Sequence, residues 1–141
     1  MIQHLTEIVD EARKRGKKRL AVAYGQDSHT LEAVYEAYKE GIVEPTLFGE
    51  KKVIEQVCAK NDIDIKAFNI VDEASDVKCV QQAVAAVVAG NADVLMKGLV
   101  STDKYMRGIL NKEAGLFPPK GVLSHVSIVE MPCTRYFWKN A

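Results

Sequence analysis

The feature that most constrains the fold is an uninterrupted apolar run from Leu20 to Tyr24. A strand with one face in water alternates apolar and polar residues, whereas a run that is apolar throughout is typical of a parallel strand covered on both faces. Further short apolar runs follow along the chain, at residues 46–49, 67–71, 92–96 and 122–131. The sequence therefore predicts several strands of one sheet.

Stretches with helical spacing of apolar residues separate these runs. We expect helices over residues 2–15, 28–40, 51–61, 75–89 and 102–112. Ser28 can cap the second helix, and Gly16, Gly41 and Gly90 stand where helices end. Strands that alternate with helices in this way predict βαβ units, and so an α/β fold: a three-layer αβα domain with a mostly parallel sheet.

Composition and missing motifs narrow the function classes. The 141 residues are 48% hydrophobic, which suits one domain with a real core. Lys and Arg number 19, as do Asp and Glu, so the basic excess typical of a nucleic-acid binder is missing. No apolar run approaches the roughly 20 residues that span a bilayer, and the first residues do not resemble a signal peptide. We expect a cytoplasmic protein that binds neither nucleic acid nor membrane. The absence of a Walker loop and of Gly-x-Gly-x-x-Gly argues against a P-loop NTPase or a standard dinucleotide fold.

The cysteines are few and widely spaced. Cys58, Cys79 and Cys133 form neither a disulfide framework nor a Cys-x-x-Cys pair. We expect Cys58 and Cys79 to behave as small buried apolar residues. The three histidines are equally scattered, so no metal site is predicted.

The strongest candidate site follows the strand expected at residues 92–96. In open α/β sheets, ligands bind beyond the carboxyl ends of the strands. Gly98 lets backbone approach a ligand closely. Ser101 and Thr102 begin a helix, whose free N–H groups and dipole favour an anion. Lys97 and the planar fork of Arg107 add positive charge. These residues predict a phosphate site, and the equally weighted alternative is that Ser101 or Thr102 is only a cap and Arg107 only a solvated side chain.

Weaker candidates lie elsewhere. Asp27, after the first strand, could bind a substrate hydroxyl or act as a base, although we favour a turn residue that caps the next helix beside Ser28. His29 fits a surface position. His125, in the expected last strand, either faces a cleft or, as we favour, is a hydrogen-bonded sheet residue. The basic run 13–19 is typical of a solvated helix end, and the alternative is attraction of an anionic ligand such as coenzyme A.

Three stretches resemble a known family. The first is residues 21–27, continued by 31–33 and by the Gly-Ile-x-x-Pro-x-Leu-x-Gly pattern of 41–49. The second and most specific is residues 92–107, which is similar to a Ser-Thr loop with its following arginine. The third is the Leu-Ser-His-Val stretch that begins at Leu123. Together they resemble the phosphate acetyl/butyryltransferase family, and most closely its butyryltransferase branch.

The resemblance implies a fold and a reaction. The fold is that of the first domain of the phosphate acyltransferases, which is similar to isocitrate and isopropylmalate dehydrogenases. In the reaction, acyl-CoA and phosphate give acyl phosphate and free coenzyme A, with no metal and no tightly bound cofactor. By motif match, phosphate or the acyl phosphate would lie at Ser101, Thr102 and Arg107, with Lys97 as supporting charge. Phosphate acetyltransferase is the close alternative. A dehydrogenase is more distant, since the metal-binding aspartates that it needs do not cluster here.

The resemblance is confined to part of the family's length. Residues 1–132 correspond to the first domain, whereas 133–141 form an atypical tail that does not match. The family's coenzyme A contacts and its proposed acid/base carboxylate lie mainly in a second domain, so the catalytic residues are not identified here. We therefore expect the 141-residue chain alone to be inactive, or else to be a non-catalytic module that binds phosphate or coenzyme A. An exposed last strand would also favour a homo-oligomer.

Overall fold

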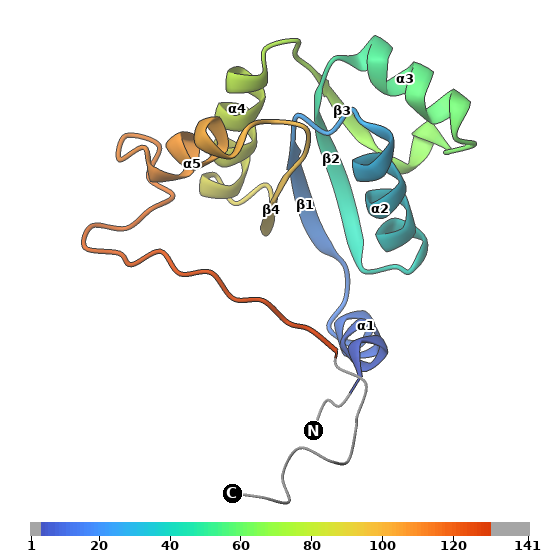
Figure 1. The fold of residues 1–141 in the computed structure, drawn as a ribbon, viewed down its shortest axis with the longest axis horizontal. Helices are drawn as coiled ribbons and strands as arrows, with labels where there is room; N and C mark the ends of the chain where they lie inside the picture. Colours follow the sequence, from blue (N-terminus) through green and yellow to red (C-terminus); the bar gives the residue numbers. More distant parts are fainter. Residues whose placement is uncertain (1–3, 131–141) are drawn as a thin grey trace, which may run out of the picture.

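The computed structural model describes residues 4–130, which form a four-stranded parallel sheet flanked by helices (Figure 1). The helices are α1 (Leu5–Lys14), α2 (Ser28–Lys39), α3 (Lys51–Lys60), α4 (Asp76–Val88) and α5 (Thr102–Leu110), with a 3-10 turn, η1 (Ile65–Ala67). The strands are β1 (Lys18–Ala23), β2 (Val43–Gly49), β3 (Asn69–Asp72) and β4 (Val94–Lys97). Their order across the sheet is β3-β2-β1-β4, and every pairing is parallel. The predicted fold class is confirmed.

Alternate residues of β1 serve the two faces of the sheet. Leu20 and Val22 pack in the core that lies under α2 and α3. Ala21 and Ala23 pack on the opposite face, where α4 contributes most of the cover. Ala21, Ala23 and the facing Ala83 of α4 are fully buried. Small side chains on both sides of this contact let the helix lie close to the central strand, and α5 packs outside it against α4. Burial on both faces explains why the β1 sequence does not alternate.

Three glycines mark the C-terminal ends of helices, and one aspartate caps the N-terminal end of another. Gly16, Gly41 and Gly90 all have positive φ, between +72° and +78°, which confirms their predicted place at helix ends. The N-terminal cap of α2 is Asp27, whose carboxylate accepts a hydrogen bond from the backbone N–H of Thr30 at 3.0 Å. Ser28 was the expected cap but is the first helical residue instead.

The strand expected at residues 67–71 begins later than predicted. Residues 65–67 form η1, because the side chain of Asp64 accepts a hydrogen bond from the N–H of Lys66 and closes a turn there. The strand then runs from Asn69 to Asp72. The strand expected at 92–96 is likewise shifted and spans Val94–Lys97.

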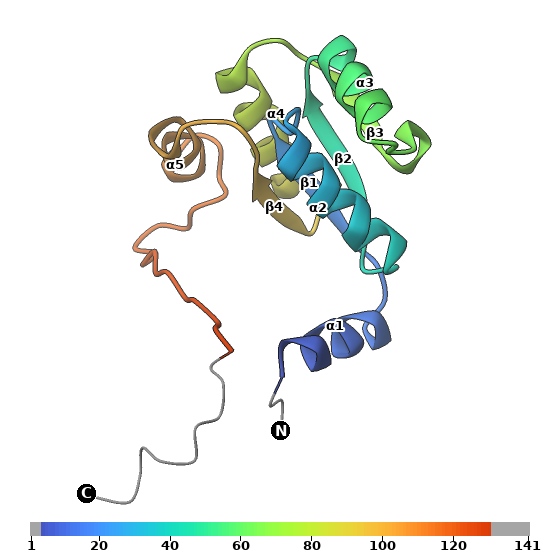
Figure 2. The ribbon, with the colours of Figure 1, turned by 45° about the vertical axis from the view of Figure 1, so that its right-hand side comes forward.

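The strand predicted at 122–131 was wrong over the part that the structure describes. Residues 122–130 lie outside any strand and are exposed, with Val122 at 90% and Val126 at 79%. Their backbone forms no ladder with another described segment, and a strand exists only where such a partner is present. Instead the chain after α5 passes through residues 111–121, and this segment then runs toward α1 (Figure 2). There the Glu130 carboxylate accepts a hydrogen bond from the N–H of Leu5 at 3.0 Å.

Candidate functional site

The two sequence stretches singled out for chemistry meet at one edge of the sheet. The strand order reverses between β1 and β4, since β2 and β3 follow on one side of β1 and β4 lies on the other. Ligands of open α/β sheets bind at such a switch point, beyond the carboxyl ends of the strands. The loops after β1 and β4 are joined there by two backbone hydrogen bonds, from Gly98 to Ala23 and from Leu99 to Tyr24, each 2.9 Å.

The backbone of a neighbouring loop packs directly against Gly98. This contact explains why the position carries no side chain. A Cβ atom at this position would lie 2.4 Å from the carbonyl oxygen of Tyr24. Tyr24 itself has a φ of 57°, in the left-handed region that bulky residues seldom adopt. Gly98 was expected to admit a ligand. The structure shows that it admits the neighbouring loop, which fixes where the following residues lie.

Ser101 and Thr102 stand at the start of α5 as predicted. Ser101 is the N-cap, and its Oγ accepts a hydrogen bond from the N–H of Lys104 at 3.3 Å. Thr102 is the first helical residue, and both residues are exposed. The first N–H groups of a helix have no partner within it, so this end of α5 presents donors and a positive dipole to solvent. The cap interpretation of Ser101 is confirmed, and the hydroxyl can still donate.

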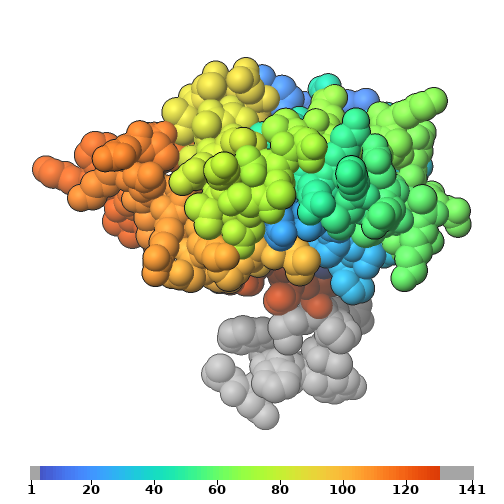
Figure 3. All heavy atoms as spheres, turned by 90° about the horizontal axis from the view of Figure 1, so that it is seen from above, coloured from blue at the N-terminus to red at the C-terminus, as the bar shows by residue number. Residues whose placement is uncertain are grey.

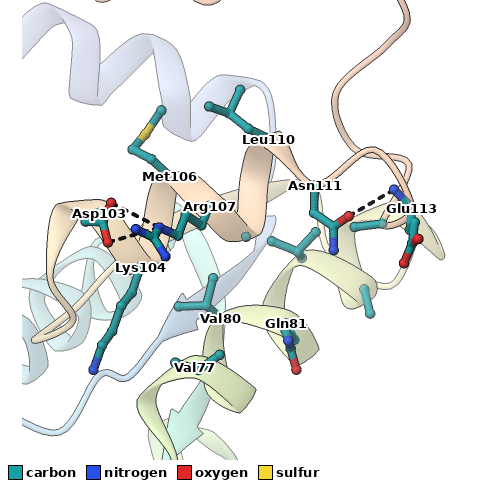
Figure 4. Close-up of a pocket in the computed structure, with 14 residues that line it drawn as sticks. Val77, Val80, Gln81, Asp103, Lys104, Met106, Arg107, Leu110, Asn111 and Glu113 are labelled. Carbon is teal, nitrogen blue, oxygen red and sulfur yellow. Dashed lines mark hydrogen bonds and ion pairs between the residues drawn. The ribbon is translucent and has the colours of Figure 1, made fainter.

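The two predicted cationic side chains, Lys97 and Arg107, lie beside different features of the molecule. Lys97 ends β4 beside this loop, and its ammonium lies 3.4 Å from the carbonyl oxygen of Gly98. Arg107 lies further along α5, with its side chain 79% exposed and its Nε 3.1 Å from the Asp103 carboxylate (Figure 4). The structure therefore groups Lys97 and Gly98 with the start of α5, whereas Arg107 lies beside a second feature.

That feature is a groove between α4 and α5, which sequence analysis did not find. It has a volume of about 1060 Å³, and apolar side chains such as Val77, Val84 and Leu110 line it, with Arg107 at its rim (Figure 4). The two helices form one flank of the molecule (Figure 3). They approach closely because Gly108 faces Val80, where an added Cβ would meet a methyl group at 2.3 Å. Gly108, a glycine within the apolar pattern of α5, was the one sequence feature that could have indicated this close packing of the two helices.

Asp27 has one engaged and one unengaged carboxylate oxygen. Oδ2 caps α2, which confirms the favoured turn interpretation. Oδ1 is sheltered from solvent, yet it has no hydrogen-bond partner among the described residues. A sheltered carboxylate oxygen without a donor is unfavourable, and Asp27 lies in the loop after β1 at the switch point.

The two candidate histidines show fewer contacts. His29 is exposed on α2. His125 is exposed and lies outside any strand, so its expected place in a sheet strand was wrong.

The basic run is largely engaged by acidic partners. Arg13 pairs with Asp10 at 2.8 Å and with Glu40. Arg19 pairs with Asp93 at 2.7 Å and donates to the carbonyl oxygen of Gly90 at 2.6 Å. These hydrogen bonds lower the pKa of the Asp93 carboxyl well below its usual range. The contacts favour the structural interpretation of this run over an anion site.

Cys58 and Cys79 are buried, as predicted. Burial raises the pKa of the Cys79 thiol to about 11, and the thiol donates to the carbonyl oxygen of Glu73 at 3.2 Å. Cys133 and the tail lie outside the described residues.

Within residues 4–130, no three His, Cys, Asp or Glu side chains gather as a metal site would require. None of the helices in that range is long and apolar enough to cross a membrane.

The fold and the site define a class: an open parallel α/β domain in which the loop after β4 and the start of α5 lie at the switch point of the sheet. The sequence profile described as phosphate acetyl/butaryl transferase matches residues 4–82. The chain belongs to this family.

Individual relatives agree with that assignment. The phosphate butyryltransferase of Clostridium acetobutylicum is 40% identical over 92% of this chain and 43% of its own length. The phosphate acetyltransferase of Thermotoga maritima is 38% identical over 91% of the chain and 42% of its own length. A phosphotransacetylase from Streptococcus pyogenes has the same fold, with a TM-score of 0.64 at 17% identity over 76% of this chain and 42% of its own. The chain thus spans less than half the length of the curated relatives that it matches.

Proposed function

We propose that this chain provides the phosphate-binding part of a phosphate butyryltransferase, which transfers the acyl group of butyryl-CoA to phosphate. The observation that carries the proposal is the loop from Lys97 to Thr102, which places a helix start and a cation at the switch point of the sheet. Identity to the clostridial butyryltransferase supports the choice of reaction.

The chemistry explains why such a site is needed. A phosphate oxygen attacks the thioester carbonyl carbon and the C–S bond breaks. The proton of the hydrogen phosphate passes to the departing coenzyme A sulfur or to solvent, and the products are butyryl phosphate and coenzyme A. Phosphate is a dianion, and positioning it as a nucleophile requires N–H donors and positive charge arranged in advance. The start of α5, with the hydroxyls of Ser101 and Thr102, supplies the donors, and Lys97 supplies charge. No metal and no tightly bound cofactor takes part in this scheme.

In this proposal Arg107 binds phosphate only after its contact with Asp103 breaks. Its guanidinium pairs with Asp103 in an exposed i,i+4 contact, and exposed pairs of this kind are weak, about 0.3–0.5 kcal/mol. A bound phosphate therefore competes readily for Arg107. Asp27 has a secondary role in the proposal, in which its unengaged oxygen accepts a hydrogen bond from a substrate hydroxyl or takes a proton.

Residues outside this chain complete the enzyme in our proposal. More than half of the length of the clostridial relative lies outside the matched region. We assign residues 1–132 to the first domain, and coenzyme A binding and acid/base catalysis mainly to a second one. The enzyme acts in the cytoplasm on small molecules as a homo-oligomer, for which the exposed apolar residues Val77, Val88 and Leu110 provide a contact surface.

A chimera tests the proposal. Residues 1–132 would replace the matched part of the Clostridium acetobutylicum enzyme, and thiol release from butyryl-CoA and phosphate would be measured. We expect turnover by the chimera and none by the 141-residue chain alone. The double change S101A/T102A should raise KM for phosphate, whereas the change of the exposed loop residue L99A should not. Turnover by the isolated chain, or an unchanged phosphate KM in the double variant, would contradict the account.

Two other functions have specific support. The Thermotoga relative is a phosphate acetyltransferase, so competition between acetyl-CoA and butyryl-CoA in the chimera decides the acyl preference. A non-catalytic module that binds coenzyme A or phosphate agrees with the short span of the match. Tight coenzyme A binding by the chain in calorimetry, together with an inactive chimera, would favour that function.

A further inference from the structure

A salt bridge joins the starts of α4 and α5. The carboxylate of Asp76, the first residue of α4, accepts a hydrogen bond from the ammonium of Lys104 at 2.5 Å. Lys104 lies in the first turn of α5, and its backbone N–H donates to Oγ of Ser101, the cap of that helix, at 3.3 Å. The two helices follow β3 and β4, whose carboxyl ends lie at the same edge of the parallel sheet. The salt bridge therefore lies beside the candidate phosphate site.

Helix geometry directs the Lys104 side chain toward this site. The Cα–Cβ bonds of a helix tilt toward its N-terminus, so a long side chain covers the turn before its own Cα. For Lys104 that turn is the start of α5, where the first N–H groups have no partner within the helix. A lysine ammonium is a compact charge on a flexible stem, so it can reach different partners from one backbone position. In the structure the side chain extends away from Arg107 (Figure 4), and its ammonium bonds to Asp76.

The Asp76 carboxylate is both anchored and charged. Its Oδ2 accepts a hydrogen bond from Lys104, and its Oδ1 accepts one from the backbone N–H of Val77 at 2.7 Å. The hydrogen bond from Lys104 lowers the pKa of the Asp76 carboxyl below its ordinary value, so the group is an anion at neutral pH. Its side chain is 28% exposed, against 68% for Asp103, the partner of Arg107. Water screens the charge of Asp76 less, so Lys104 is the more tightly held of these two α5 cations.

Other contacts hold α5 in place without this salt bridge. Gly108 packs against Val80 of α4. The Tyr105 hydroxyl donates a hydrogen bond to the carbonyl oxygen of Leu95, in β4, at 3.4 Å. These two contacts attach α5 to a helix and to a strand, whereas exposed salt bridges add little stability. The main effect of the Asp76–Lys104 pair is therefore on the charge near the start of α5.

We propose that Asp76 is a positioning residue that limits the affinity of the candidate site for phosphate by keeping Lys104 bound to itself. This inference rests on the function proposed above. When Asp76 is neutral, the Lys104 ammonium is free to contact a phosphate oxygen at the start of α5. When Lys104 is neutral, the Asp76 carboxylate is unpaired and repels the dianion. The two single changes therefore shift phosphate affinity in opposite directions, whereas loss of a purely mechanical tie would weaken binding in both.

Phosphate titrations of the intact 141-residue chain test this inference, with the NMR amide shifts from Gly98 to Lys104 as the readout. D76N should lower the Kd for inorganic phosphate by about two- to fivefold and K104M should raise it by about as much, which is the range expected of one exposed charge pair. The double variant D76N/K104M should fall between them. The differences should shrink at high ionic strength, because salt screens exposed charges. Weaker binding in both single variants, or no change in either, would overturn the inference.

A matched acid at the other end of the sheet provides the control. Asp10 pairs with Arg13 at 2.8 Å in α1, which precedes β1 and so lies where the strand begins (Figure 1). D10N removes the same charge as D76N and should leave the Kd for phosphate unchanged. An equal effect of D10N and D76N would assign the change to net charge and would overturn the inference. D76E keeps the charge and should retain the wild-type affinity.

The outcome also separates this inference from the proposed function. Weaker phosphate binding in S101A/T102A, together with unaltered binding in D76N and K104M, would overturn the role of Asp76 alone. Absence of phosphate shifts at the start of α5 in the wild type and in every variant would overturn the phosphate site itself, and this inference with it. Urea denaturation of each variant confirms that the titrated protein is folded.

Discussion

Gly98 and Tyr24 are in backbone contact across the switch point of the sheet, so close that a methyl group on Gly98 would lie 2.4 Å from the Tyr24 carbonyl oxygen. The carbonyl of Tyr24 in turn accepts the N–H of Leu99 at 2.9 Å. This contact sets the path of the chain from β4 to α5, and with it the position of the proposed phosphate site.

The G98A variant should lose stability and displace the start of α5. The added methyl group meets backbone atoms, which cannot rotate away, so we expect a cost of about 1–3 kcal/mol in the free energy of unfolding. Urea denaturation measures it. L99A changes the exposed neighbour in the same loop and should stay within about 0.5 kcal/mol of the wild type. A G98A variant as stable as L99A would show that the loops are not in close contact.

The contact between Val80 and Gly108 should behave as a coupled pair. G108A gains about 1 kcal/mol of helix propensity but forces its Cβ to within 2.3 Å of the Val80 side chain. V80A removes that obstacle, so the double variant should be more stable than the sum of the single changes by about 1 kcal/mol or more. The control cycle uses Val84, whose methyl group would lie at an ordinary 3.9 Å. Additive effects in the Val80 cycle, like those expected with Val84, would exclude the close approach.

The pairing of Arg19 with Asp93 predicts an acid-dependent contribution to stability. The hydrogen bonds from Arg19 lower the pKa of the Asp93 carboxyl in the folded state below its ordinary value of 3.8. The contribution is thus fully present well above pH 3.8 and is lost as the pH falls through the lowered value. R19Q should raise the pKa of Asp93 toward 3.8 in a carboxyl NMR titration. Its stability deficit relative to the wild type should shrink as the pH falls below 3.8. An unchanged pKa would refute the role of Arg19.

The buried cysteines should resist alkylation. Burial raises the pKa of Cys79 to about 11, and only the thiolate reacts. At pH 8, iodoacetamide should leave Cys58 and Cys79 unmodified in the folded C133S variant and label both in urea, as read by mass spectrometry. Rapid labelling of Cys79 in the folded protein would mean that α4 is not packed on β1 as the structure shows.

Local sequence pattern predicted much of the fold. The apolar run of β1 indicated a strand buried on both faces, and Gly16, Gly41 and Gly90 marked helix ends correctly, because these signals depend on the residue and its immediate neighbours. The strand expected after Val122 was wrong because strand formation depends on a partner elsewhere in the chain. For the same reason the sequence did not show that Gly98 meets Tyr24, or that Gly108 meets Val80.

The sequence also predicted part of the candidate site. The position of Ser101 and Thr102 at a helix start followed from local spacing. Asp103 lies one turn before Arg107 on the same helix, an i,i+4 spacing that favours pairing, but spacing alone does not show whether the guanidinium contacts this carboxylate or a ligand. The groove between α4 and α5 depends on how two helices cross, which composition does not reveal.

The most direct test of the central claim is an NMR titration of the chain with inorganic phosphate and then with coenzyme A, with sodium chloride of equal ionic strength as the control. The account predicts amide shifts concentrated from Gly98 to Lys104, with smaller shifts from Tyr24 to Asp27, and a weaker response in S101A/T102A. Shifts confined to the basic run from Arg13 to Arg19, or equal shifts with sodium chloride, would contradict a phosphate site at the start of α5.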